Sequence, residues 1–210
     1  MEDAGLVASE WKGGSQVFSR VRNHPLGKVL KSLVNSDRAA PKPVFESKRN
    51  TAVKEELAYL GMPVNAAKKK PKRNESLEAL VASGCKLARR DASVARALPV
   101  FLFEHRDELN VNKLKTESKK RGQKHAMGFF LALTSELSGY AEMKEWAEGF
   151  RDRRRKNPTY FFANPTKHTK RVAGLKTPEV ARSWNLLMNM SMDSFASTFD
   201  KFSHAASYAR

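Results

Sequence analysis

The sequence contains a single cysteine, Cys85, among its 210 residues. One cysteine excludes an internal disulfide and a zinc site built from cysteines, so we expect a reducing compartment. Long apolar runs are also missing: the two longest, 97–103 and 126–133, fall far short of the roughly 20 residues that cross a bilayer. The first residues are acidic and lack the apolar run of a secretory signal. We therefore expect a soluble intracellular protein with no membrane partner, either cytoplasmic or nucleoid-associated, or nuclear in a eukaryotic cell.

The sequence also lacks the local motifs of common catalytic and nucleotide-binding sites. It has no Gly-x-Gly-x-x-Gly fingerprint, no Gly-rich loop ending in Lys-Ser/Thr, and no Gly-x-Ser-x-Gly elbow. The five histidines are scattered, and no two have the spacing of a metal pair on one helix. The acidic run at 104–108, which includes His105, would need a second carboxylate set on a facing helix to hold a metal. A solvated helix end with local ion pairs explains that run better, and we expect no enzyme, no metal and no cofactor.

Acidic residues are few, because 22 Asp and Glu face 39 Lys and Arg, which gives a net charge of +17. Three basic clusters, at 68–73, 113–124 and 151–171, together carry a charge equal to this whole excess. A charge of this size and sign favours an anionic partner, and the leading hypothesis is a non-catalytic protein that binds nucleic acid, either DNA or RNA.

The third cluster encloses three consecutive aromatic residues, Tyr160, Phe161 and Phe162, between two Asn-Pro pairs. Cations beside aromatics suit a groove that tracks a nucleic-acid strand, with charge for the phosphates and ring faces for the bases. The alternative is that the aromatics pack into the core while the arginines are solvated or paired with carboxylates, as Glu148 and Arg151 could be. The sequence leaves both interpretations open.

We predict phosphate contacts from all three clusters, with the third making the largest contribution. Its predicted contact residues, including one aromatic for stacking, are Arg151, Arg153, Arg154, Arg155, Lys156, Tyr160, Lys167, Lys170 and Arg171. The second cluster contributes Lys113, Lys119 and Lys120, and the first contributes Lys68, Lys69 and Lys70. The 68–73 run resembles a single-cluster nuclear localisation signal, but we interpret it as a flexible basic arm. If about six phosphates are engaged, log K should fall with log salt with a slope of roughly −5.

Apolar residues recur at helical spacing along most of the chain, and no stretch alternates with the period of a strand. We therefore expect an all-α fold without a sheet, with a single bundle of about six to seven helices at 75–210. The most apolar segments, 94–103 and 127–137, should form its centre. Expected helices span 74–90, 91–103, 110–122, 123–137 and 141–155, with two more starting at Thr177 and Ser191, and 157–176 is expected to be irregular. The expected helix-capping residues are Asn74, Asp91, Asn110 or Asn112, Thr177 and Gly139, and Pro99 should kink its helix or end it early.

The order of the second cluster and the helix after it is the reverse of a DNA-reading helix-turn-helix. In that motif the second helix enters the major groove and presents polar residues. Here the basic helix comes first, and the following helix at 123–137 is apolar. We therefore expect the 113–124 segment to be an exposed helix that contacts backbone phosphates.

Residues 1–74 read as a basic arm punctuated by prolines, with short helices expected at 26–34 and 52–60. Such pieces are too short to fold alone, so this arm would be ordered on a partner. The alternative function follows from this segment: a regulatory or antitoxin-type subunit whose residues 16–62 fold onto an acidic protein partner.

Overall fold

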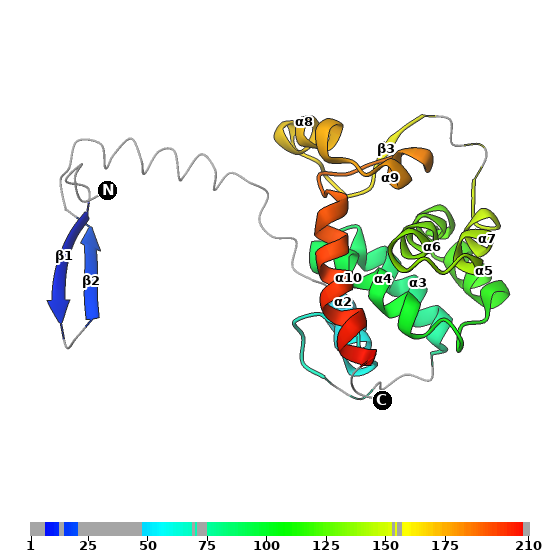
Figure 1. The fold of residues 1–210 in the computed structure, drawn as a ribbon, viewed down its shortest axis with the longest axis horizontal. Helices are drawn as coiled ribbons and strands as arrows, with labels where there is room; N and C mark the ends of the chain where they lie inside the picture. Colours follow the sequence, from blue (N-terminus) through cyan, green and yellow to red (C-terminus); the bar gives the residue numbers. More distant parts are fainter. Residues whose placement is uncertain are drawn as a thin grey trace. The chain divides into compact units, whose positions relative to one another are not determined.

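Figure 1 shows the computed structural model of the chain. It describes residues 7–12, 15–20, 48–68, 70, 75–152, 154 and 157–207, with the backbone alone at 7–12, 15–20 and 204–207. The chain divides into two compact units, residues 1–46 and 47–210. The helix expected at 26–34 lies outside the described residues.

The first unit contains an antiparallel pair of strands, β1 (Val7–Lys12) and β2 (Ser15–Arg20). Val7 lies opposite Arg20 and Lys12 opposite Ser15. The expectation of no sheet is therefore wrong here. The two residues between the strands are both glycines in the sequence, a composition typical of two-residue hairpin turns. The glycine pair is the sequence signal for this pairing, because the flanking runs are short and alternate weakly.

The second unit is built mostly of helices, which confirms the expectation of a mostly helical protein. Its elements in chain order are α2 (Lys48–Tyr59), α3 (Leu77–Ala88), α4 (Ala92–Glu104), α5 (Val111–Lys120), α6 (Lys124–Ser138), α7 (Glu142–Glu148), β3 (Thr159–Tyr160), α8 (Lys167–Lys176), α9 (Glu179–Ser183), β4 (Leu186–Leu187) and α10 (Met192–Ser207). No helix in the described part of the chain is both long and apolar enough to cross a bilayer.

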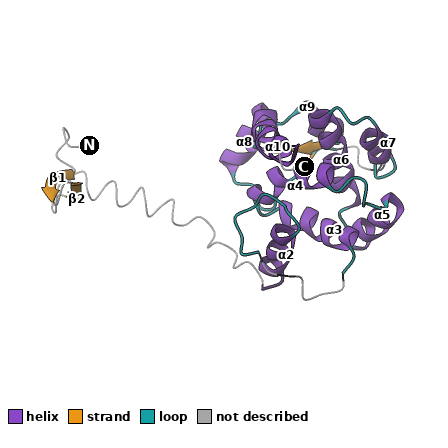
Figure 2. Cartoon of the chain, turned by 60° about the horizontal axis from the view of Figure 1, so that its bottom comes forward, coloured by secondary structure: helices purple, strands orange, loops and turns teal. Residues whose placement is uncertain are grey.

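The core of this unit is centred on α4 and α6, as the apolar segments predict. Leu98 and Leu102 of α4 and Phe129 and Phe130 of α6 are fully buried. Helices α3, α6 and α10 all pack on α4, which lies inside the ring of helices in Figure 2. The helix α4 continues through Pro99 to Glu104, so the expectation of an early end is wrong. Burial on several sides stabilises this helix despite the backbone hydrogen bond that proline cannot donate.

Helix α2 is part of the second unit and packs on α3. Val53 and Leu57 are buried, and Lys54 Nζ lies 2.6 Å from Asp91 Oδ2 at the start of α4. This helix was expected to belong to the arm, because its short apolar stripe does not reveal whether it packs on its own chain or on a partner. In the structure its stripe is covered by the chain itself.

Several helix ends match their predicted capping residues. Asp91 Oδ1 accepts hydrogen bonds from the backbone N–H groups of Ser93 and Val94, and Asn110 caps α5. Gly139 ends α6 in the left-handed conformation, with φ of 73°. The cap of α3 is Ser76 rather than Asn74.

Three expectations in the C-terminal half are wrong. Helix α7 ends at Glu148 instead of continuing to 155, and α8 occupies part of the stretch expected to be irregular. Thr177 was expected to cap α9, but its hydroxyl instead accepts a hydrogen bond from Met188 N at 2.9 Å. At Thr177 a contact with another part of the chain replaces the local capping pattern.

Candidate functional site

The aromatic run at 160–162 is held by a short parallel pairing of β3 with β4. Phe161 N donates to Leu187 O at 2.8 Å, and Arg89 Nε donates to Phe161 O at 3.0 Å. The Phe161 ring is 2% exposed and packs on Phe129 and Phe130. For Phe161 the core interpretation is therefore correct.

Tyr160, in contrast, points away from that core and is half-buried. The ammonium of Lys170 lies 5.7 Å from the centre of its ring, within the range of a cation–π contact. Phe162 is also half-buried and packs edge-on against Phe161. The run therefore alternates between a core residue and two residues nearer the surface.

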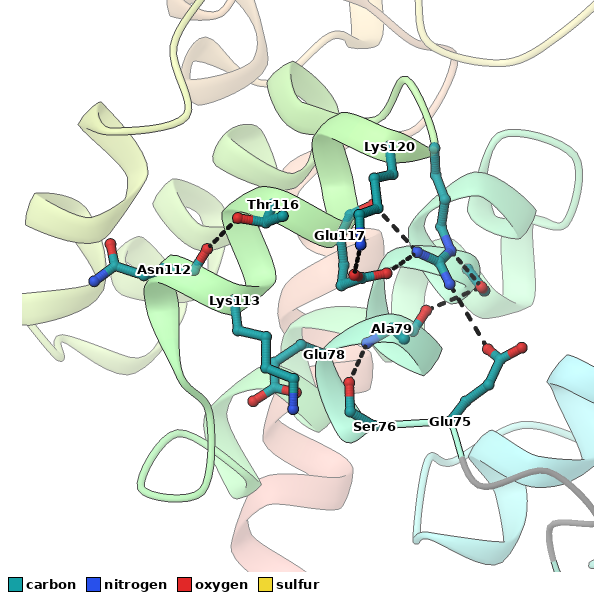
Figure 3. A network of polar contacts seen from close by, with 11 residues as sticks. Glu75, Ser76, Glu78, Ala79, Asn112, Lys113, Thr116, Glu117 and Lys120 are labelled. Carbon is teal, nitrogen blue, oxygen red and sulfur yellow. Dashed lines mark hydrogen bonds and ion pairs between the residues drawn. The ribbon is translucent and has the colours of Figure 1, made fainter.

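Two of the three lysines chosen from the second cluster have carboxylate partners (Figure 3). Lys113 Nζ lies 3.2 Å from Glu78 Oε2, and Lys120 Nζ lies 2.7 Å from Glu117 Oε1. Burial raises the pKa of Glu78, but hydrogen bonds from backbone N–H groups and from Lys113 outweigh it and leave that pKa below its ordinary value. The Glu78 carboxylate thus stays charged and holds Lys113 against the start of α3. Lys119 has no such partner among the described residues.

The third cluster also divides into a residue that holds the structure together and residues that face solvent. Arg151 donates to Glu148 Oε1 at 2.8 Å and to Ser183 O at 2.8 Å, and its guanidinium lies 4.2 Å from the Trp184 ring centre. Arg154 has a side chain that is 92% exposed, and its pairing with Asp152 raises its pKa further above the ordinary value. The predicted contact residues Arg153, Arg155 and Lys156 lie outside the described residues.

The remaining predicted contact residues are exposed. Lys167, Lys170 and Arg171 lie on α8, which Thr166 caps by accepting a hydrogen bond from the backbone N–H of Thr169. Lys68 and Lys70 are exposed in an irregular segment, and Lys69 lies outside the described part of the chain.

The structure brings parts of the second and third clusters together around a surface cavity of about 580 Å³, here called the basic hollow. It lies between the C-terminal half of α5, the first turn of α6 and the segment that follows α7. The described residues that line it are Lys115, Thr116, Lys119, Gly122, Lys124, His125, Arg151, Asp152 and Arg154. Its only acidic residue within this lining, Asp152, is paired with Arg154. The hollow is therefore strongly positive.

Three lysines of the basic hollow are available to a ligand. Lys115, Lys119 and Lys124 make no ion pair with any residue that the structure describes. Lys115 reaches across toward the end of α7, where its Nζ lies 3.5 Å from the position that a Cβ on Gly149 would take. Lys115 and Lys124 belong to the second cluster but were not among its predicted contact residues. The i,i+4 spacing of Lys115 and Lys119 would have placed both on one helix face.

His125 joins the wall of the basic hollow to the core. Its Nδ1 accepts a hydrogen bond from the backbone N–H of Asp152 at 3.2 Å, so its Nε2 donates to Trp184 O at 2.6 Å. The ring is 6% exposed and is held in one neutral tautomer by these two contacts. It thereby fixes the start of the 151–154 segment beside α6.

Two further candidate reactive groups, Cys85 and His105, do not line the basic hollow. Burial raises the pKa of the Cys85 thiol far above its ordinary value, so this cysteine is a core residue and not a nucleophile. His105 pairs locally with Glu108 at 3.3 Å, as the helix-end interpretation predicts. Within the described ranges, no three His, Cys, Asp or Glu side chains cluster as metal ligands would.

Comparison with protein-family models, with curated proteins and with solved structures finds no match to this chain.

Proposed function

We propose that this protein binds nucleic acid without catalysing a reaction, and that the basic hollow is its principal phosphate-binding surface. The observation that supports this most directly is the gathering around one cavity of three lysines, Lys115, Lys119 and Lys124, that make no ion pair within the described chain. Two of them come from α5 and one from the first turn of α6. The exposed Arg154 extends this surface.

Unpaired cations matter because nucleic-acid affinity depends mainly on neutralising phosphates and releasing their counterions. A lysine already paired with a carboxylate gains less from a phosphate, since it must first give up its partner. Lys113 and Lys120 belong to this paired group. Three phosphates bound by the three lysines would give a slope of log K against log salt of about −2 to −3. Contacts from Lys167, Lys170 and Arg171 on α8 would make the slope steeper.

The test is equilibrium binding of the full chain to a labelled oligonucleotide of about 16 nucleotides, single-stranded and duplex, between about 50 and 200 mM salt. The variant Lys115→Gln/Lys119→Gln/Lys124→Gln should reduce the magnitude of the slope by about 2 for single strands and about 2.7 for duplex. The matched control is Lys144→Gln/Lys176→Gln/Lys201→Gln, which removes the same charge from exposed residues that do not line the hollow.

The two variants separate local contact from general charge. Equal losses in both would mean that only the overall charge matters and that the basic hollow is not the binding surface. A wild-type slope near zero would contradict nucleic-acid binding altogether. In that case an acidic protein that co-purifies and protects the N-terminal residues from proteolysis would favour the protein-interaction alternative.

A further inference from the structure

A second cavity, of about 340 Å³, lies beside β3 near the starts of α4 and α10, and is here called the aromatic pocket. It shares no described lining residue with the basic hollow. Its lining comes from residues 90–96, from residues 160–173, from residues 187–190 and from Ser194 of α10. In Figure 1, α8 and β3 lie together at the end of α10 where that helix begins.

The wall of the aromatic pocket combines ring surface with hydrogen-bonding groups. Tyr160 and Phe162 contribute aromatic surface, and Met188 contributes a soft apolar surface. Asn164 and Asn189 also line the pocket and are exposed, so their amides are open to a ligand. An amide offers both a donor and an acceptor, as the edge of a nucleobase does.

Two arginines border the aromatic pocket with no described carboxylate to balance them. Arg90 is exposed and Arg96 half-buried, and neither side chain bonds to another residue in the part of the chain that the structure describes. Arg90 also lines a neighbouring cavity of about 250 Å³, together with Arg49, Lys86 and Arg121, of which Arg121 is paired with Glu117 and Glu75. That cavity has no acidic residue in its described lining. A cationic path therefore leads from the side of α3 to the rim of the aromatic pocket.

We propose that the aromatic pocket receives one unpaired nucleobase of a single strand, with the flanking phosphates bound by Arg90 and Arg96. This inference rests on the proposed function and specifies its substrate class. A cavity of 340 Å³ is near the lower end of the range for ligand sites and suits a single nucleotide unit. A base within a duplex is stacked and paired, and reaching the pocket would require its extrusion. The protein should therefore bind a single strand more tightly than a duplex of the same length at equal salt.

The test compares a single-stranded oligonucleotide with one of the same length that carries phosphates and sugars but no bases. Stacking of one base should make the normal strand bind about 5- to 150-fold more tightly to the wild-type chain. The variant Tyr160→Leu keeps an apolar side chain, and its affinities for the normal strand and for the strand without bases should become nearly equal. Its slope of log K against log salt should stay unchanged. The matched control is Tyr59→Leu, because Tyr59 is exposed on α2 and does not line the pocket.

The outcomes separate this inference from the proposed function. Salt-dependent binding with equal affinity for both strands would overturn the base pocket and leave the phosphate surface intact, and this comparison needs only the wild-type chain. No binding to either strand at low salt would overturn both. Adenosine monophosphate tests for a free nucleotide: if it binds the wild type but not Tyr160→Leu while bases in the strand add nothing, the pocket takes free nucleotides and the strand proposal is wrong.

Discussion

Gly128 lies on α6 where this helix passes Trp184 and Phe150. A Cβ built on Gly128 would lie 2.5 Å from Trp184 Cη2 and Cζ3 and 2.8 Å from Phe150 Cβ. Neither neighbour has room to move away, since Trp184 is 1% exposed and Phe150 is fully buried. The Trp184 backbone is also held by His125, and the Trp184 ring by Arg151. The variant Gly128→Ala should therefore strain the packing behind the basic hollow.

The magnitude follows from two opposing effects. Alanine favours a helix over glycine by about 1 kcal/mol, which alone would stabilise α6. Overpacking a rigid core costs typically about 1–3 kcal/mol, and contacts as short as these place Gly128→Ala at the upper end. We expect a net loss of about 2 kcal/mol in the free energy of unfolding. For a chain of this size this corresponds to a decrease in Tm of roughly 4–8 °C.

Urea unfolding followed by tryptophan fluorescence and by circular dichroism measures this effect. The control is Gly174→Ala on α8, where a Cβ would meet no described atom within 4 Å. The same substitution should there stabilise the protein by about 0.5–1 kcal/mol. If Gly128→Ala is as stable as the wild type or more stable, the packing argument is refuted.

Three further predictions concern buried or half-buried groups. Burial raises the pKa of Asp91, but hydrogen bonds from Lys54 and Ser93 outweigh it and lower the pKa overall. The variant Lys54→Met should therefore lower the free energy of unfolding by about 1–3 kcal/mol at neutral pH. A carboxyl group whose pKa is lowered in the folded state stabilises the protein at pH values above its unfolded-state pKa of about 3.9. The destabilisation caused by Lys54→Met should therefore shrink as the pH falls below about 4 and Asp91 becomes protonated. Urea unfolding at a series of pH values measures this change. The Cys85 thiol should not react with a thiol reagent in the native protein and should react fully in denaturant, and a rapid native reaction would contradict its burial. Thr177→Val should cost about 1–3 kcal/mol in urea unfolding, because the buried N–H of Met188 loses its acceptor, and an unchanged stability would argue against that bond.

The helices with long apolar stripes could be predicted from the sequence, because burial and local pattern agree there. Helices α4 and α6 are the examples, with Asp91 and Gly139 at their ends. Helix α8 could not be predicted, since Ala173 is its only buried residue within the described chain and its apolar pattern is weak. Its local signal is the cap at Thr166, which the preceding Asn-Pro pair obscures.

The charges of the candidate site were visible in the sequence, but their partners on distant segments were not. Composition shows that the 113–124 segment is basic, yet only the fold reveals that Lys113 faces Glu78 across the start of α3. The i,i+3 spacing of Glu148 and Arg151 indicates their pairing, whereas the contact of Arg151 with Trp184 is revealed only by the fold. Pairing between distant segments therefore helps to decide which cations remain available, and residue spacing along one helix indicates only the local pairs.

The packing of α10 on α4 has a consequence for the order in which the chain is synthesised. Phe199 of α10 contacts Phe103 at the end of α4, with ring centres 5.5 Å apart. Helix α4 leaves the ribosome long before α10, so the apolar surface of α4 that α10 covers stays exposed until α10 has been synthesised. Contacts between such distant segments also slow folding, because a long loop must close before they form. During synthesis this surface is the part of the protein for which a chaperone would be most useful.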